Sequence, residues 1–179
     1  MNNRDEDDVD AENNSLSEGM EVMTELEKLV EFTKERSRSI FNEDGGIIPT
    51  FFCHVPNVDG YGMIPCHWEN GRQKHLMVSL VKEKFLELGV DRYAFAAESW
   101  IAIRASDELT DTLPPSQSPN RQECILIHAE EKGGLSKTGQ FSIKRDGEKF
   151  STGEFVQFEE GLSGIGVTFS NMFGENSFH

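Results

Sequence analysis

The stretch DRYAFAAESWIAIR, residues 91–104, decides which fold the sequence predicts. Successive side chains of a strand point to opposite faces, and here both alternating sets consist mainly of alanine, aromatic and branched residues. Two largely apolar faces are typical of a strand in the interior of a sheet. We therefore expect residues 91–104 to form a long central strand.

A helix is expected immediately before this strand, between Asn70 and Gly89. Asn70 is a favoured N-terminal cap, Gln73 stands at the reciprocal capping position, and Gly89 is a typical residue at a helix end. The apolar residues between them recur at helical spacing, namely Leu76, Met77, Leu80, Val81, Phe85 and Leu88. This helix is expected to present one coherent apolar face.

Two strands, residues 47–55 and 61–68, are expected before the helix. The first is rich in β-branched and aromatic residues. Asp59-Gly60 between the two segments favours a two-residue hairpin, because a type I′ turn needs positive φ at both central positions.

The register of this hairpin places Cys53 opposite Cys66. It also places Pro56 and Pro65, which have no backbone donor, at hydrogen-bonding positions. Only a sheet edge, a bulge or a wider loop would accommodate them there.

The chain after the central strand predicts a loop and further strands. Residues 105–120 are rich in serine, proline and aspartate and are expected to form a loop. Residues 121–131 and the segment around 141–145 alternate as strands, and Asp146-Gly147 closes the latter. The sequence therefore predicts an α+β fold with a mixed or antiparallel sheet of about five strands, a helix packed on one face and an N-terminal helix.

The N-terminal part of the chain is divided by composition. Residues 1–14 are acidic with almost no apolar side chains, which predicts a disordered tail. The remainder, residues 15–179, is expected to be one domain. It is expected to consist of an N-terminal helix at 15–40 and the core sheet and helix at 47–152. The last segment, 153–179, is rich in glycine and phenylalanine and is ambiguous between strand and helix.

The N-terminal helix is expected to begin at a capping box, Ser15 to Glu18, and to carry an apolar stripe. The stripe consists of Met20, Met23, Leu26, Leu29, Val30 and Thr33. A stripe of this kind packs either on the chain's own sheet or on a partner. Residues 16–37 are therefore a possible surface for a protein partner or a homo-oligomer.

Charge and composition exclude several classes of protein. The net charge is −15, of which residues 1–19 carry −6 (one Arg against seven Asp and Glu). Direct binding to a nucleic-acid backbone is not expected, because it needs clustered Lys and Arg. No run of 18 apolar residues is present, and three cysteines are too few for a disulfide scaffold, so we expect no membrane insertion and a cytoplasmic location.

Glu98, Arg121, Glu123 and His128 are the candidate site residues. Glu98 lies among apolar neighbours in the central strand, where an ionised carboxylate needs a partner or a raised pKa. Arg121 is the expected partner, because a guanidinium suits a carboxylate. This pair either ties the loop to the sheet or forms part of a functional cleft in which Glu98 is an acid with a perturbed pKa.

Metal and cofactor motifs are incomplete. Cys53 and Cys66 are each followed by a histidine, but adjacent residues on a strand face opposite ways, so the two pairs make only a weak zinc candidate. His128-Ala129-Glu130 lacks the cysteines of a zinc deaminase, and the glycine-rich residues 161–166 lack the lysine of a P-loop. No cofactor is expected.

Two motifs resemble those of a family of uncharacterised bacterial and phage proteins. One is the order strand, Asp-Gly turn, strand, helix and a strand with Glu98-Ser99-Trp100. The other is PSQSPNRQE, residues 115–123, which is similar to the family's Pro-Ser-x-x-Pro-x-Arg-x-Glu segment and is followed by a similar Arg145-Asp146-Gly147.

The similarity to this family spans roughly residues 48–173. Ser99 stands where the family often has alanine, and Asn120 stands where it usually has aspartate. The resemblance implies a shared fold, and it implies no activity.

Two hypotheses follow for the function. The first is a non-enzymatic protein-binding or regulatory domain, because no complete catalytic constellation is visible. The second is a small hydrolase-like enzyme in which Glu98 acts as general acid or base and Arg121 binds an anionic group.

Overall fold

The computed structural model describes residues 22–102, 114–158 and 172–173. The elements are α1 (Glu25–Asp44), β1 (Thr50–His54), β2 (Gly62–Pro65), α2 (Gly71–Leu88), β3 (Arg92–Ala102), a 3₁₀ turn (Pro115–Gln117), β4 (Arg121–Glu131), β5 (Ser136–Asp146) and β6 (Lys149–Gln157). Residues 1–14, the predicted disordered tail, lie outside the described residues.

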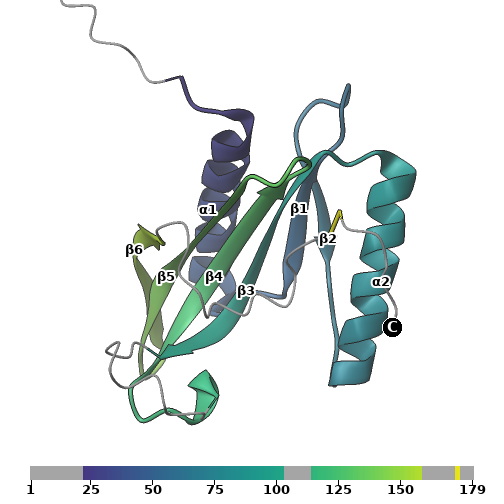
Figure 1. The fold of residues 1–179 in the computed structure, drawn as a ribbon. Helices are drawn as coiled ribbons and strands as arrows, with labels where there is room; N and C mark the ends of the chain where they lie inside the picture. Colours follow the sequence, from purple (N-terminus) through teal and green to yellow (C-terminus); the bar gives the residue numbers. More distant parts are fainter. Residues whose placement is uncertain (1–21, 103–113, 159–171, 174–179) are drawn as a thin grey trace, which may run out of the picture.

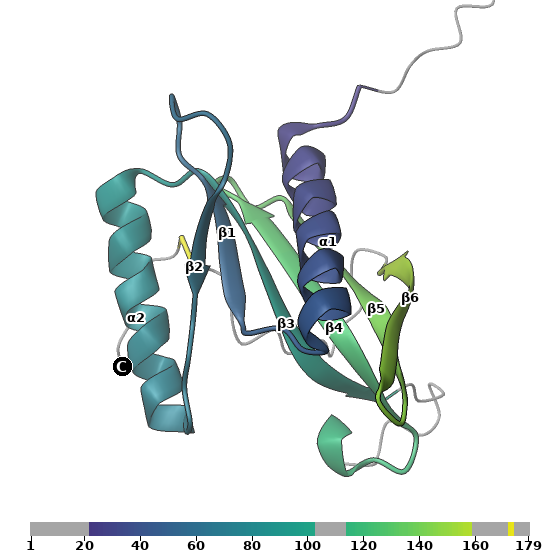
Figure 2. The same cartoon turned by 180° about the vertical axis from the view of Figure 1, so that it is seen from behind.

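The six strands form one antiparallel sheet in the order β2-β1-β3-β4-β5-β6 (Figure 1). α1 lies across one face of the sheet, and α2 lies beside the β2 end (Figure 2). The predicted α+β class is confirmed. The sheet is antiparallel rather than mixed, and it has six strands rather than about five.

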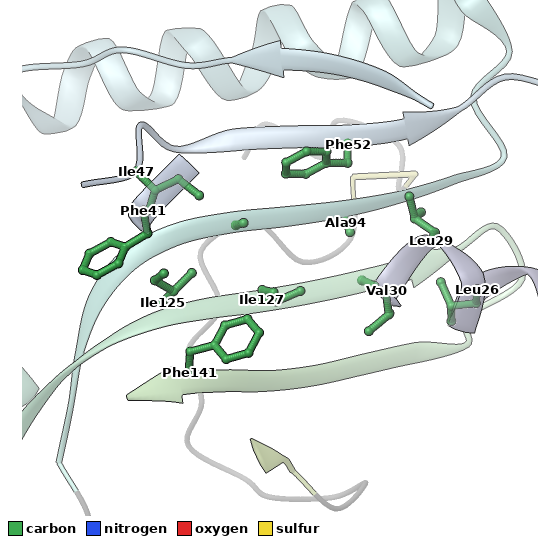
Figure 3. Close-up of a cluster of buried hydrophobic side chains, with 12 residues drawn as sticks. Leu26, Leu29, Val30, Phe41, Ile47, Phe52, Ala94, Ile125, Ile127 and Phe141 are labelled. Carbon is green, nitrogen blue, oxygen red and sulfur yellow. The ribbon is translucent and has the colours of Figure 1, made fainter. Parts of the chain in front are cut away.

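β3 is the central strand that the sequence predicts, with β1 and β4 on its two sides. Its two faces contribute to two apolar clusters. The cluster under α1 contains Leu26, Leu29, Val30, Phe41, Ile47, Phe52, Ala94, Ala96, Ile125, Ile127, Ala129 and Phe141 (Figure 3). The cluster on the α2 side contains Phe51, Cys53, Cys66, Val81, Phe85, Val90, Tyr93, Phe95 and Met172.

α1 begins later than expected. Its N-terminal cap is Thr24, whose hydroxyl accepts from the Glu27 N–H (3.2 Å) while the Glu27 carboxylate accepts from the Thr24 N–H (2.7 Å). The expected start at Ser15 would place Gly19 inside the helix, which costs about 1 kcal/mol. A start at Glu25 avoids this cost, because the same type of capping box recurs at Thr24.

The apolar stripe of α1 packs on the chain's own sheet. Its buried residues are Leu26, Leu29, Val30, Thr33, Ser37 and Phe41. The helix also continues past residue 40 to Asp44, and Gly45 ends it with a φ of 71°. From Leu26 onward the stripe is therefore not free for a partner.

The hairpin between β1 and β2 differs from the predicted one. Cys53 lies opposite Gly62 rather than opposite Cys66. The connection is a wide loop in which the Val58 N–H donates to the Val55 carbonyl oxygen (3.1 Å). The predicted two-residue turn is wrong, because the prolines exclude its register.

The observed register accommodates Pro65. The Cys66 N–H donates to the Pro49 carbonyl oxygen (2.7 Å), and hydrogen-bonding directions alternate along an antiparallel pair. The nitrogen of Pro65 therefore points away from β1, at the free edge of the sheet, where no donor is required.

β6 overlaps the start of residues 153–179, which the sequence left ambiguous between strand and helix. Phe141 pairs with Phe155, but Ile143 pairs with Thr152, so β6 carries one extra residue there. This bulge places Phe150 and Phe155 on the same face of the sheet although their spacing is odd.

Candidate functional site

Glu98, Glu123 and Arg145 form a charged cluster on the α1 side of the sheet, one from each of β3, β4 and β5. Arg145 Nη2 is 2.9 Å from Glu98 Oε2, and Arg145 Nε is 3.0 Å from Glu123 Oε2. The hydrogen bonds that Arg145 donates to the Glu123 carboxylate are the main cause of its raised pKa. The guanidinium is therefore a permanent cation between two carboxylates.

The cluster also holds the connection between α1 and β1. Glu98 Oε1 accepts from the Ile47 N–H (2.8 Å), and Arg145 Nη1 donates to the Gly45 carbonyl oxygen (2.6 Å). The Arg145 guanidinium lies 5.2 Å from the centre of the Phe41 ring. Both oxygens of Glu98 are thus engaged in contacts that fix the chain.

Arg121 is not the partner of Glu98. Its Nη1 donates to the Ser116 carbonyl oxygen (2.8 Å), and its guanidinium lies 5.1 Å from the centre of the Trp100 ring. Arg121 therefore ties the 3₁₀ turn to the sheet. The structure places Arg145 beside Glu98. The spacing of the two residues in the sequence does not indicate that they pair.

His128 lies on the opposite face of the sheet from Glu98 and Glu123. β3 pairs Glu98 with Ile125, so odd-numbered residues of β4 share the face of Glu98 and even-numbered ones do not. The four candidates are therefore not brought together in one site.

The surroundings of His128 are polar but closed. Nδ1 is 2.8 Å from the Thr138 hydroxyl, and Nε2 is 3.8 Å from Glu130 Oε2. The same Glu130 oxygen accepts from the Tyr93 hydroxyl (2.6 Å). Burial lowers the pKa of His128 and raises that of Tyr93, so both side chains are held neutral.

The three cysteines are buried apolar residues. Cys53 and Cys66 belong to the cluster on the α2 side. Burial raises the pKa of the Cys66 thiol to about 11 and that of Cys124 to about 12. Within residues 22–102, 114–158 and 172–173, no three His, Cys, Asp or Glu side chains are grouped so as to hold a metal ion.

The outer face of α2 carries apolar side chains that are exposed in the described part of the chain. Both predicted caps are present, Asn70 and Gly89, yet Val81 and Phe85 are the buried residues of its 18. Leu76 is 61% exposed and Leu80 is 50% exposed.

A shallow groove runs along this face of α2. We define the α2 groove as His67, Glu69, Gln73, Leu76, Met77 and Leu80. The sequence does contain a signal for it, because the six apolar positions of α2 cover a wider arc than a helix packed on one side can bury.

Charge is distributed unevenly along the chain. The described part contains 15 of the 17 Lys and Arg residues but 18 of the 32 Asp and Glu residues, so its net charge is −3. The remaining −12 belongs to residues outside the described part. The described part of the chain is therefore nearly neutral.

No family model, no curated protein and no solved structure matches this chain. The resemblance in the two motifs around Glu98 and residues 115–123 therefore stays an interpretation of those motifs. In the part of the chain that the structure describes, no helix has the length and apolar character needed to cross a membrane.

Proposed function

We propose that this chain is a non-enzymatic protein-binding domain and that the α2 groove is its binding surface. The observation that carries the proposal is the exposure of Leu76 and Leu80, one helical turn apart, beside the partly buried Met77. Side chains at i and i+4 lie on one face of a helix, so they present a single apolar surface.

The energetics favour a partner on this surface. Burying a leucine side chain contributes about 1.5 to 3 kcal/mol, and exposed apolar surface with a polar rim is typical of interaction sites. Glu69 and Gln73 form such a rim here. A helix or an extended segment laid along α2 would bury both leucines together.

α2 is better supported as the binding surface than residues 16–37. The apolar stripe of α1 is already covered by the sheet from Leu26 onward. Leu76 and Leu80 have no such cover in the described part of the chain. A partner or a second copy is therefore proposed on α2.

The alternative is an enzyme that uses Glu98 and Arg121, and the geometry separates these two residues. Glu98 lines a cavity together with Ile47 and Met63, and Arg121 does not line it. Glu98 accepts hydrogen bonds on both oxygens, and Arg121 is bound to the 3₁₀ turn instead of facing it. A general acid or base needs an oxygen within reach of a substrate proton.

Differential capture tests the proposal. The full chain, the variant Leu76→Ser/Leu80→Ser and the control Leu86→Ser are each crosslinked in an extract of the native cells. Leu86 is 76% exposed but lies outside the α2 groove, so it controls for the loss of an exposed leucine on the same helix. We expect the full chain and the control to capture a common protein that the double variant does not. Equal capture by all three would contradict the proposal.

A further inference from the structure

We infer that a cavity at the end of α1 is a second binding site of this chain, and that its occupant is a lysine side chain of a partner protein. We define the corner cavity as the hollow, about 530 Å³ in volume, that Asp44, Ile48, Met63 and Glu98 line together with their neighbours. None of these residues belongs to the α2 groove, so the inference goes beyond the proposed function.

The corner cavity lies where four parts of the chain meet on the α1 face of the sheet. Asp44 ends α1, Ile48 lies in the connection to β1, Met63 is on β2 and Glu98 is on β3. Met63 pairs with Phe52, which packs under α1, so both side chains lie on this face. Ligand pockets usually measure about 300 to 1,000 Å³, and the corner cavity is therefore large enough for a long side chain.

The rim of the corner cavity is apolar and exposed. Ile48 is 58% exposed and Met63 is 40% exposed. A pocket for a small molecule usually encloses most of its ligand, whereas exposed apolar side chains around a cavity become buried when a polypeptide lies over them. The rim therefore favours a side chain that a partner protein presents over a free small molecule.

The charges that line the corner cavity favour a cation. Asp44 and Glu98 line it, and none of its described lining residues is Lys, Arg or His. The Asp44 carboxylate makes no hydrogen bond or ion pair with the residues that the structure describes. The last turn of α1 has no basic residue, so its carbonyl dipoles add negative potential here. A complementary occupant therefore carries a positive charge.

Arg145 does not neutralise the corner cavity. Its guanidinium is shared between Glu98 and Glu123, which leaves one carboxylate in excess, and Asp44 adds a second. Glu98 accepts one hydrogen bond on each oxygen, from the Ile47 N–H and from Arg145. A carboxylate has about four acceptor positions, so Glu98 can also accept from a bound cation without releasing Arg145.

Lysine fits these acceptors better than arginine. Arg145 already makes the paired contacts of a guanidinium with the Glu123 carboxylate. The acceptors that remain are single oxygens on different residues, which suit the three rotatable donors of a compact ammonium group. The four-carbon stem of a lysine would then lie along Ile48 and Met63.

Peptide binding tests the inference in the full chain. The probe is the acetylated and amidated peptide Ala-Leu-Lys-Leu-Ala, and the matched control peptide has norleucine in place of lysine. NMR follows the methyl signal of Met63 and the backbone amide signal of Ile47 during each titration. We expect the lysine peptide to shift both signals saturably and the norleucine peptide to bind about fivefold more weakly, because it lacks the charge.

Two pairs of variants locate the contacts. Asp44→Asn should weaken the binding of the lysine peptide about threefold to fivefold, whereas Glu43→Gln, in the same helical turn but outside the corner cavity, should leave it unchanged. Ile48→Ser should weaken it about tenfold. Val58→Ser is the control for Ile48→Ser, because Val58 is 57% exposed and does not line the cavity. Unshifted signals of β3 and β4 verify the folding of each variant.

Butylamine distinguishes a protein partner from a small amine. It has the stem and the amino group of lysine but no peptide, so it leaves the rim uncovered and should bind more weakly than the lysine peptide. Equal affinity for butylamine would identify a small amine as the occupant and overturn the inference. Equal affinity for the norleucine peptide, or equal effects of Asp44→Asn and Glu43→Gln, would overturn it as well.

The outcome is separate from that of the capture experiment. Leu76→Ser/Leu80→Ser should bind the lysine peptide as tightly as the unmodified chain does. A loss of peptide binding in this double variant would place the peptide on the α2 groove, which would overturn the inference and leave the proposed function intact.

Discussion

Arg145 on β5 reaches Glu98 on β3 across the intervening strand β4, with 2.9 Å between Nη2 and Oε2. Glu123 on β4 makes this possible, because it accepts from the same guanidinium at 3.0 and 3.1 Å. The three side chains thus bind three strands and the α1–β1 connection into one unit.

Removing this cation is expected to lower the stability. Arg145→Met leaves Glu98 and Glu123 facing each other and breaks the bond to Gly45, so the free energy of unfolding should fall by about 1 to 2 kcal/mol. This value allows for solvent screening, because the three side chains are 24 to 38% exposed. Urea unfolding measures it, with the exposed Lys144→Met as the control. An unchanged midpoint for Arg145→Met would show that the cluster contributes nothing.

The packing of α1 on the sheet is expected to dominate the stability. Leu29 is fully buried between the helix and the sheet, so Leu29→Ala should lower the free energy of unfolding by about 2 to 5 kcal/mol. Leu86→Ala, at an exposed position, should change it by less than about 0.5 kcal/mol. Thermal unfolding of both variants checks this. Similar effects at the two positions would contradict the assigned position of α1.

The start of α1 can be tested at its cap. Thr24→Ala removes the hydroxyl that accepts from the Glu27 N–H, which should cost about 0.5 to 2 kcal/mol. Ser15→Ala, at the cap that the sequence predicts, is the matched control and should have no effect. The reverse order of effects in urea unfolding would place the helix start at residue 15 after all.

The stability is expected to fall on mild acidification because of His128. Burial lowers its pKa in the folded chain below the ordinary value of 6.5, so below pH 6.5 the unfolded chain binds a proton that the folded chain does not. The free energy of unfolding therefore falls as the pH drops through 6.5 toward the folded pKa, by at most about 1.4 kcal/mol per pH unit.

Urea unfolding at pH 7.5 and pH 5.5 measures this dependence. His128→Gln should reduce it, since glutamine does not titrate, while the exposed His75→Gln should retain it. An identical pH dependence in His128→Gln and the unmodified chain would show that His128 does not cause it.

The elements with complete local signals were predictable from the sequence. β3 was predicted because both of its faces are apolar, and α2 because Asn70 and Gly89 bracket its periodic residues. The register of β1 with β2 was not predictable from the sequence. Pro65 excludes the register that the Asp-Gly turn favours, and which other register forms is determined only in the assembled sheet. The segment of β6 stayed ambiguous between strand and helix, because its bulge breaks the alternation between Phe150 and Phe155.

The candidate site was less predictable than the fold. Glu98 was identified as a residue in need of a partner, and it has one. The choice of Arg145 over Arg121 depends on β5 lying next to β4 and on the diagonal reach of a long side chain. The residues around Glu98 in the sequence indicate neither the order of the strands nor this diagonal contact.

The position of Pro65 has a consequence for the behaviour of the chain at high concentration. An exposed strand with free backbone groups can template the addition of strands from other molecules, which leads to fibrils. β2 is four residues long and presents a proline at that edge, and β6 at the other edge is bent by its bulge. Neither border of the sheet therefore offers a flat template, so the native chain should resist strand-by-strand polymerisation.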